Sequence, residues 1–250
     1  IACDRKKEEE NSEAVEELRR ETGCGFCLGR NPDDLVERAD GIVISPGIPV
    51  DSPFIKKAAE SGIEVISEVE LAYRYCKAPI IAITGTNGKT TTTTLVGEIL
   101  NASGRNTYVV GNIGVPFTDV VGTATADDAV VAEISSFQLE TVHRFRPAVS
   151  VMLNITEDHL NRHKTMGNYI AVKSRIFENQ DSKGVVVLNG DDAILSRLQP
   201  DTKARVLYFS RKKILSRGAW VENNRIVMDI GKGPEKICPV GDIFIPGAHN

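Results

Sequence analysis

The stretch of sequence that decides the fold is IIAITGTNGKT, residues 80–90. Its leading apolar residues are typical of a buried strand, and Gly85 and Gly88 predict a tight loop. The threonine-rich segment 91–94 then belongs to a helix. A strand, a glycine-rich loop and a helix in this order form the unit from which parallel α/β sheets are built.

The loop within this stretch favours phosphate binding. Its glycines let backbone N–H groups turn toward phosphate oxygens, and the N-terminus of the following helix adds partial positive charge. Lys89 offers a point charge to the β- and γ-phosphates, and Thr90 places a hydroxyl where Mg²⁺ sits in such loops. The glycines are closer together than in the pattern G-x-x-x-x-G-K-[ST], so an ordinary strand-to-helix turn is the alternative. Gly-Lys-Thr at this junction favours a nucleotide.

Short apolar runs alternate with helical patterns on both sides of the loop, which predicts an α/β fold with a mostly parallel sheet. The pattern restarts near residue 77, where we expect a boundary between domains at 1–77 and 78–250. We expect helices at 12–22, from 52 and at 68–75, further strands at 41–44, 64–66, 129–132, 149–153, 185–188 and 206–209, and an antiparallel hairpin over 220–229.

The composition indicates a soluble globular protein. The 250 residues are 41% hydrophobic and 26% charged, with a net charge of −4. This balance argues against charge-driven nucleic-acid binding, and no apolar run approaches the ~20 residues of a membrane span. The five cysteines are scattered and odd in number, as expected of reduced cytosolic thiols. Cys24 and Cys27 form a C-x-x-C pair without the second pair that a zinc site needs, so we interpret them as ordinary thiols.

At both ends, the printed sequence has the pattern of a secondary-structure element that is cut short. The sequence begins at Ile1, and the segment 1–4 is typical of the end of a buried strand. Asn250 is a good helix N-cap that no helix follows. We therefore expect the chain to be part of a longer one.

Polar residues follow two of the later strands. Glu133 closes the first, where a carboxylate would lie over the ligand crevice of a parallel sheet and could bind Mg²⁺. A second group follows the strand at 149–153 and comprises Asn154, Glu157, Asp158 and His159. The alternatives are a surface acid and a capping histidine, but two acids beside His159 favour a metal or phosphate role.

Three further residues carry weaker signals. Lys173 shares a helix face with Ile170 and Phe177. A lysine on such a face usually extends its amine toward solvent, so the helical pattern alone does not favour a function. His143 and His163 have no pair of acidic residues directly before them, as His159 has, and we interpret them as surface residues.

Six motifs occur in an order that resembles the Mur ligases, the ATP-dependent amide ligases of peptidoglycan precursor synthesis. They are Ser45-Pro46-Gly47, Gly85 to Thr91, Gly111 to Gly114, Ser135 to Glu140, Asn154 to His159 and Tyr169 to Lys173. The loop alone also fits a folylpolyglutamate synthetase. The third and fourth motifs favour the branch of the family that adds D-glutamate to UDP-N-acetylmuramoyl-L-alanine.

The resemblance implies three domains. Residues 1–77 would be most of a Rossmann-like domain that binds the UDP end of the substrate, without its first strand. Residues 78–250 would be most of a P-loop-type central ATP-binding domain, and the C-terminal domain would be absent. We therefore expect the printed chain alone to be inactive. We expect the intact protein to be a cytoplasmic monomer that binds neither nucleic acid nor membrane and serves cell-wall synthesis, cell shape and cell division.

The resemblance also implies roles for individual residues. Lys89, His159 and Lys173 would be catalytic, and CO₂ would carbamylate Lys173 to give an oxygen ligand. Two Mg²⁺ ions would be held by Thr90, Glu133, His159 and the carbamate of Lys173. ATP would be bound by Gly85, Thr86, Asn87, Gly88, Lys89, Thr90, Thr91 and Asn250, with His249 also near the adenine. The other substrate would contact Asp4, Ser45, Gly47, Asn112, Ser135 and His159.

The reaction implied begins when the L-alanyl carboxylate attacks the γ-phosphorus of ATP. The resulting acyl phosphate is then attacked by the amine of D-glutamate. A site that brings two anions together needs positive charge above all. Two alternatives stay open: a sister ligase that adds another amino acid, and a nucleotide-binding module or NTPase-like switch without synthetic activity.

Overall fold

The computed structural model describes residues 1–245 of the chain. Its contacts divide the chain into two compact units, the first being Ile1–Ile66 and the second beginning at Ser67. The sequence pattern predicts a boundary near residue 77, later than this division by contacts. The division falls earlier because α3 (Glu68–Tyr75) buries Val69 and Ala72 in the core of the second unit.

The first unit contains two small sheets. β1 (Ala2–Asp4) pairs in parallel with β2 (Phe26–Leu28), and α1 (Ser12–Glu21) lies between them in the chain. β3 (Gly41–Ile44) pairs with β4 (Glu64–Ser67), and α2 (Pro53–Glu60) lies between these two. Short 3₁₀ turns occupy Glu8–Glu10 and Val36–Arg38. The helices and strands predicted in this region are confirmed, and β2 is an additional strand.

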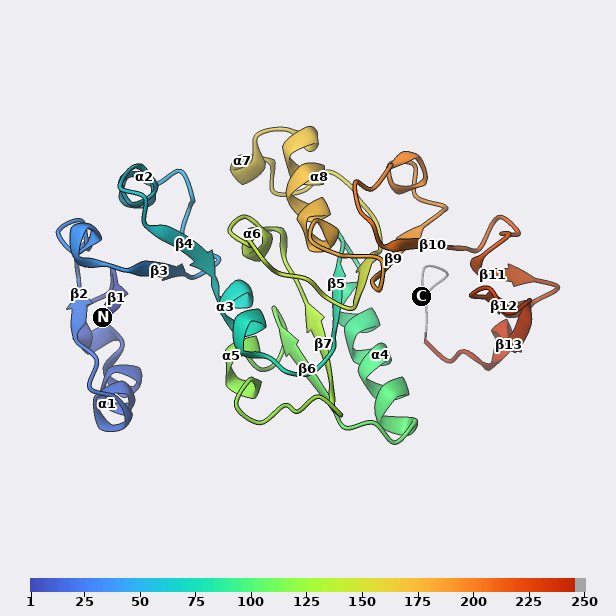
Figure 1. Ribbon diagram of the computed structural model, residues 1–250, viewed down its shortest axis with the longest axis horizontal. Coiled ribbons are helices and arrows are strands. Elements are labelled where there is room, and N and C mark those ends of the chain that lie inside the picture. Colours follow the sequence, from blue (N-terminus) through green and yellow to red (C-terminus); the bar gives the residue numbers. More distant parts are fainter. Residues whose placement is uncertain (246–250) are drawn as a thin grey trace. The chain divides into compact units, whose positions relative to one another are not determined.

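The second unit is built on one nine-stranded sheet (Figure 1). The strands lie in the order β6-β7-β5-β8-β9-β10-β11-β12-β13. The first seven are parallel, while β12 and β13 are antiparallel to their neighbours. The bounds are β5 Ile80–Thr84, β6 Thr107–Gly111, β7 Ala129–Glu133, β8 Val149–Met152, β9 Val185–Asn189, β10 Arg205–Ser210, β11 Gly218–Glu222, β12 Arg225–Asp229 and β13 Glu235–Pro239.

The predicted antiparallel hairpin is confirmed as β11 and β12. Asn223 and Asn224 connect the two strands with positive φ angles of 48° and 59°. Asparagine tolerates this backbone conformation better than other residues with side chains, and two consecutive positive φ angles suit the twist of a hairpin.

Helices and 3₁₀ turns connect the strands of this sheet. The remaining helices are α4 Lys89–Ala102, α5 Phe117–Val120, α6 Ser136–Leu139, α7 Leu160–His163 and α8 Met166–Ser174, with 3₁₀ turns at Arg175–Phe177, Leu195–Arg197 and Val240–Asp242. Gly97 of α4 packs so close to β6 that an added Cβ would lie 2.4 Å from a methyl carbon of Val109. The core itself joins α3, α5 and α8 to the sheet through Val69, Phe117, Tyr169, Ile80 and Ala82.

The strand order reverses beside β5. The chain runs from β5 to β6 and β7 on one side, then passes to β8 on the other side of β5. Such a reversal of strand order leaves a ligand crevice at the strand ends of an open α/β sheet. Thr84, Glu133 and Met152 end the three strands that meet there.

The carboxylate of Glu70 ties α3 to the segment that precedes β8. It is fully buried and accepts backbone N–H bonds from His143, Arg144 and Phe145 at 2.9–3.1 Å. Nε of Arg74 donates a further bond of 3.0 Å. Burial alone would raise the pKa of Glu70, but these donors outweigh burial and keep the pKa below its ordinary value.

We expect Glu70→Ala to lower the free energy of unfolding by about 3 kcal/mol, because it leaves buried backbone donors and Arg74 without their acceptor. Since the folded-state pKa is depressed, the contribution of Glu70 is present above its unfolded pKa and is lost as pH falls through the folded value. Urea unfolding of this variant and of the exposed control Glu98→Ala, at neutral and acidic pH, measures both effects. Equal unfolding midpoints for the two variants would contradict this role.

Candidate functional site

The glycine-rich loop lies at the carboxyl end of β5, and its glycines are required by its shape. Gly85 has a φ of +153°, and an added Cβ would lie 3.1 Å from Cβ of Leu153. Gly88 adopts the left-handed conformation, with φ +80°, as the N-cap of α4. A residue with a side chain would be strained at Gly88. The loop therefore leads directly into the N-terminus of a 14-residue helix.

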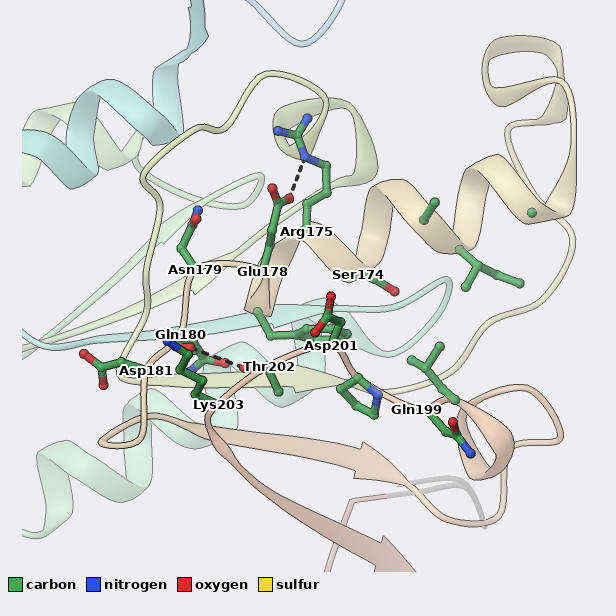
Figure 2. A pocket seen from close by; sticks show the side chains of 16 residues that line it. Ser174, Arg175, Glu178, Asn179, Gln180, Asp181, Gln199, Asp201, Thr202 and Lys203 are labelled. Atoms are coloured by element: carbon green, nitrogen blue, oxygen red, sulfur yellow. Dashed lines mark hydrogen bonds and ion pairs between the residues drawn. The ribbon is translucent and has the colours of Figure 1, made fainter.

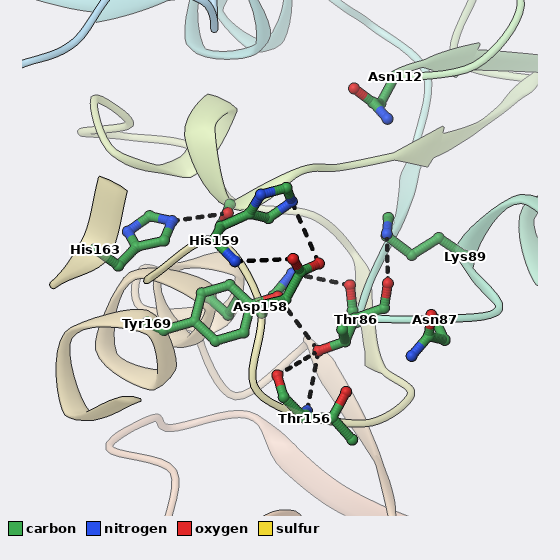
Figure 3. A network of polar contacts seen from close by, with 12 residues as sticks. Thr86, Asn87, Lys89, Asn112, Thr156, Asp158, His159, His163 and Tyr169 are labelled. Atoms are coloured by element: carbon green, nitrogen blue, oxygen red, sulfur yellow. Dashed lines mark hydrogen bonds and ion pairs between the residues drawn. The ribbon is translucent and has the colours of Figure 1, made fainter. Parts of the chain in front are cut away.

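Lys89 is the first residue of α4, and its side chain folds back over the loop. Its Nζ donates to the backbone oxygen of Thr86 at 2.9 Å (Figure 3). The first N–H groups of a helix have no acceptors within the helix, and they carry partial positive charge. The loop thus presents an ammonium group and helix N–H groups at one place, which is an arrangement suited to phosphate.

Glu133 connects the loop helix to the neighbouring strands. Its Oε2 accepts a bond from Oγ1 of Thr90 at 2.8 Å, and its Oε1 accepts one from Nδ2 of Asn112 at 3.0 Å. Gly111 allows this approach, because a Cβ there would lie 2.3 Å from the backbone oxygen of Glu133. The predicted residues Thr90, Glu133 and Asn112 are therefore brought together.

The surroundings of Glu133 fit a magnesium ion. Its side chain is only 2% exposed, and within residues 1–245 no lysine, arginine or histidine forms an ion pair with it. Carboxylate and hydroxyl oxygens are ligands that Mg²⁺ accepts. The described residues contain no group of three histidine, cysteine or acidic side chains that could hold a metal. A magnesium ion here would thus take its remaining ligands from water and from phosphate oxygens, as in other nucleotide sites.

Lys173 is buried beside the same loop and does not reach solvent. The residue is 2% exposed, and its Nζ donates to the backbone oxygen of Gly85 at 2.9 Å and to Oγ1 of Thr84 at 3.3 Å. Burial, aided by the positive charge of Lys89, lowers the pKa of Lys173 to about 7, against a smaller opposing effect of Asp158. Lys173 is thus a buried amine whose pKa lies near neutrality, at the edge of the glycine-rich loop.

The contacts of His159 are with Asp158 and Phe137. His159 has a positive φ of 51°, and its Nε2 lies 3.4 Å from Oδ2 of Asp158 (Figure 3). Its ring packs 4.9 Å from that of Phe137, between centroids. No described contact joins His159 to Glu133 or Lys173.

The other predicted site residues fall into three groups. Some are exposed, some form hydrogen bonds with residues close by in the sequence, and some lie outside the described residues. Oγ of Ser135 caps α6 by accepting from the N–H of Gln138 and donates to Oε1 of the same residue. Thr91 is exposed in the first turn of α4. In the first unit, Asp4 accepts a bond from the N–H of Lys6, while Ser45 and Gly47 are exposed. His249 and Asn250 lie outside the described residues.

The surface interpretation of His163 was wrong. The residue is 4% exposed, its Nε2 lies 3.0 Å from Oγ of Ser136, and its Nδ1 lies 3.6 Å from Oε1 of Glu140. Burial lowers the pKa of this histidine. The short helix α7 turns it inward toward α6, a tertiary contact that no local sequence pattern indicates.

A separate cavity lies on the other side of α8. It has a volume of about 730 Å³ and lies between α8 with its 3₁₀ extension and the segment 198–203 (Figure 2). Ser174 lines it, and Arg175 and Glu178 form an ion pair of 3.0 Å beside it. No predicted site residue lines this cavity. The structure therefore separates the glycine-rich loop from this cavity.

No helix among the described residues combines the length and the apolar character needed to cross a membrane.

Comparisons with known proteins agree on one family. The Mur ligase middle domain matches residues 83–233, and the MurD-like N-terminal domain of Mur ligases matches residues 2–67. The UDP-N-acetylmuramoylalanine–D-glutamate ligases of Thermoanaerobacter sp. strain X514 and Caldanaerobacter subterraneus subsp. tengcongensis are 48% and 50% identical over 250 residues. These alignments cover 100% of this chain but 55% and 54% of the relatives, so the chain spans about half their length.

A solved structure shows the same fold. It is the UDP-N-acetylmuramate:L-alanyl-gamma-D-glutamyl-meso-diaminopimelate ligase of Neisseria meningitides, with a TM-score of 0.54 and 20% identity. The match covers 91% of this chain and 75% of that chain.

Proposed function

The chain belongs to the Mur ligase family, and from this premise we propose that the intact protein is an ATP-dependent ligase that joins D-glutamate to UDP-N-acetylmuramoyl-L-alanine. The ATP-dependent part of the proposal is supported by the loop at 85–90. There Lys89 and Thr90 begin α4, and Thr90 bonds to the carboxylate of Glu133. The choice of amino acid is supported by relatives of 48–50% identity that are named for D-glutamate.

Lys89 and Thr90 of the loop, together with Glu133 and Asn112, have defined tasks in this proposal. Lys89 exchanges its bond with the oxygen of Thr86 for phosphate oxygens of ATP, and the helix N–H groups bind the same anion. Thr90 and Glu133 would hold Mg²⁺. When bound, this ion supplies positive charge that offsets the phosphates. Asn112 keeps the Glu133 carboxylate in position through its 3.0 Å bond.

The reaction is a phosphoryl transfer followed by an acyl transfer. The L-alanyl carboxylate attacks the γ-phosphorus, the bond to the bridging oxygen breaks, and ADP leaves. The amine of D-glutamate attacks the acyl carbon, loses a proton, and inorganic phosphate leaves. Because the first step joins two anions, the positive groups around the loop are its main requirement. Holding the reactants together in the correct orientation supplies the rest of the acceleration.

Lys173 is proposed to react with CO₂ and act as a carbamate. Its neutral amine forms an N–C bond to CO₂ and releases one proton, which replaces a buried amine by an anionic oxygen ligand. The support is its pKa of about 7 and the absence of an ion-pairing carboxylate among residues 1–245. The carbamate and His159 would hold a second Mg²⁺, for which the imidazole of His159 must leave Asp158.

The remaining assignments are part of the same proposal. Residues 1–77 would serve the UDP end of the substrate, with Asp4, Ser45 and Gly47 among its contacts, and Ser135 and Asn112 would lie along the substrate path. Asn250 would be near the adenine. The intact protein would act in the cytoplasm, as a monomer, where UDP-linked peptidoglycan precursors are made.

Phosphate release by the intact protein tests the proposal directly. The assay supplies ATP, Mg²⁺ and UDP-N-acetylmuramoyl-L-alanine together with one amino acid at a time. Release with D-glutamate alone is the expected result. Release only with L-alanine or a diamino acid would indicate a sister ligase, and nucleotide binding without release would indicate a module without synthetic activity.

A further inference from the structure

We propose that Asn154 is a positioning residue that holds the phosphate loop in its binding shape, an inference that rests on the proposed function of the loop. Asn154 follows β8, and its side-chain amide pairs with both backbone groups of Asn87. Oδ1 accepts the N–H of Asn87 at 2.8 Å, and Nδ2 donates to the oxygen of Asn87 at 2.9 Å. Asn87 lies in the loop between its two glycines, where backbone freedom is greatest.

The neighbouring residues extend this pairing. The N–H of Thr86 donates to the backbone oxygen of Asn154 at 3.0 Å. The N–H of Thr156 donates to Oγ1 of Thr86 at 3.0 Å (Figure 3). Tyr169 adds a hydroxyl contact of 3.2 Å to the same Oγ1. Residues 154–156 therefore run alongside residues 86–87 and bond to them repeatedly.

This segment is itself anchored by the end of β9. Oδ2 of Asp192 accepts the N–H of Ile155 at 3.1 Å, and its Oδ1 accepts the N–H groups of Ile194 and Leu195 at 2.9 Å. Asn189 adds a bond from its Nδ2 to the oxygen of Leu153 at 2.9 Å. The loop after β5 is thus braced by the side chains of Asn154, which follows β8, and of Asn189 and Asp192, which end and follow β9.

The pairing decides which loop groups are available to a nucleotide. Both backbone groups of Asn87 are occupied by Asn154, so the phosphate oxygens must be met by the N–H groups that follow, from Gly88 into the first turn of α4. A loop fixed in this shape before binding does not lose conformational freedom when the nucleotide arrives, which strengthens binding. The positioning effect should therefore appear in nucleotide affinity more than in the affinity for other substrates.

Binding of MgADP to intact protein variants tests this inference. We expect Asn154→Ala to raise the Kd for MgADP by about 10- to 100-fold, as loss of a supporting contact does at other sites. The KM for the UDP-linked substrate should change little. Asn154→Asp keeps the size and one acceptor but loses the donor to the oxygen of Asn87, so it should weaken binding as well.

Asn179→Ala is the matched control. Nδ2 of Asn179 also bonds two backbone oxygens, those of His143 and Phe145 at 3.1 and 3.2 Å, away from the loop. It should lower the melting temperature without weakening MgADP binding. If Asn154→Ala and Asn179→Ala have the same Kd for MgADP, the inference is wrong. If the wild-type protein itself binds no MgADP, the proposed function fails instead.

Hydrogen exchange of the wild-type protein gives a test that requires no variant. The amide of Asn87 should exchange slowly before any nucleotide is added, whereas the amides of Gly88, Lys89 and Thr90 should gain protection when MgADP binds. Fast exchange at Asn87 in the nucleotide-free protein would overturn the inference, even if a variant failed to fold.

Discussion

Replacing Lys89 with alanine in the intact protein is expected to slow D-glutamate-dependent phosphate release by about 10³-fold or more, because one directed positive charge on a transferring phosphoryl group has an effect of this size. Nζ of Lys89 lies 2.9 Å from a loop oxygen and can turn to a phosphate placed at the start of α4. Lys89→Arg should restore little, because the guanidinium is larger and its donors point in fixed directions.

The loss should be specific to chemistry at the loop. Lys183→Ala removes an exposed lysine of the same unit and should leave the rate unchanged. Circular dichroism and melting temperature establish that Lys89→Ala is folded. A folded Lys89→Ala protein that keeps more than about a tenth of the wild-type rate would contradict the role of Lys89.

Replacing Lys173 is expected to abolish turnover by a different cause. Lys173→Ala should lose about 10³-fold in rate, and excess bicarbonate should not restore it, because no amine remains to react with CO₂. Lys173→Met fills a similar volume without the amine. It should fold about as stably as the wild type, since the loss of two hydrogen bonds is offset by removing the cost of burying an amine that has no carboxylate partner among the described residues, yet stay inactive.

The pH dependence of the carbamate follows from the pKa of Lys173. An ordinary lysine, with a pKa near 10.4, is neutral in only about one molecule in a thousand at pH 7.5. The pKa of about 7 makes most of the Lys173 amine neutral at that pH, and the neutral fraction rises as pH rises through this value. With ¹³C-bicarbonate, the wild-type protein should show a carbamate carbon signal that grows from pH 6 to 8.

The Lys173→Met variant provides the control for this signal. It should lack the carbamate resonance at every pH. Two results would contradict the carbamylation of Lys173. One is turnover of Lys173→Ala at the wild-type rate, and the other is a carbamate signal in Lys173→Met as strong as in the wild type.

The sequence predicted the parts of the site that depend on the ends of parallel strands. Thr90 and Glu133 are 43 residues apart, yet their meeting follows from placing two strand ends at one edge of a sheet. The buried strands β5 and β7 could also be predicted, because each is a continuous apolar run. β6 carries a glycine and a polar start, and β13 begins with two charged residues and is exposed over its first three, so neither resembles a buried strand.

Residues that act through tertiary contact could not be predicted in this way. The burial of His163 depends on the inward turn of α7, and the pairing of Asn154 with Asn87 depends on loop geometry. Lys173 has the sequence signature of an exposed lysine, and its burial arises because α8 packs its amine under Gly85. For such residues the local sequence pattern indicates only the secondary structure. It cannot indicate the contact, because the partner lies far away in the chain.

The central claim is that the loop and the Thr90–Glu133 pair bind a magnesium nucleotide. Calorimetric titration with ADP tests this claim most directly. The intact wild-type protein and the Glu133→Gln variant are each titrated twice, once in Mg²⁺ and once in EDTA. The account predicts tight binding by the wild type that weakens at least about tenfold in EDTA, and weak binding by Glu133→Gln that no longer responds to Mg²⁺. Equal affinities in all four titrations would contradict it.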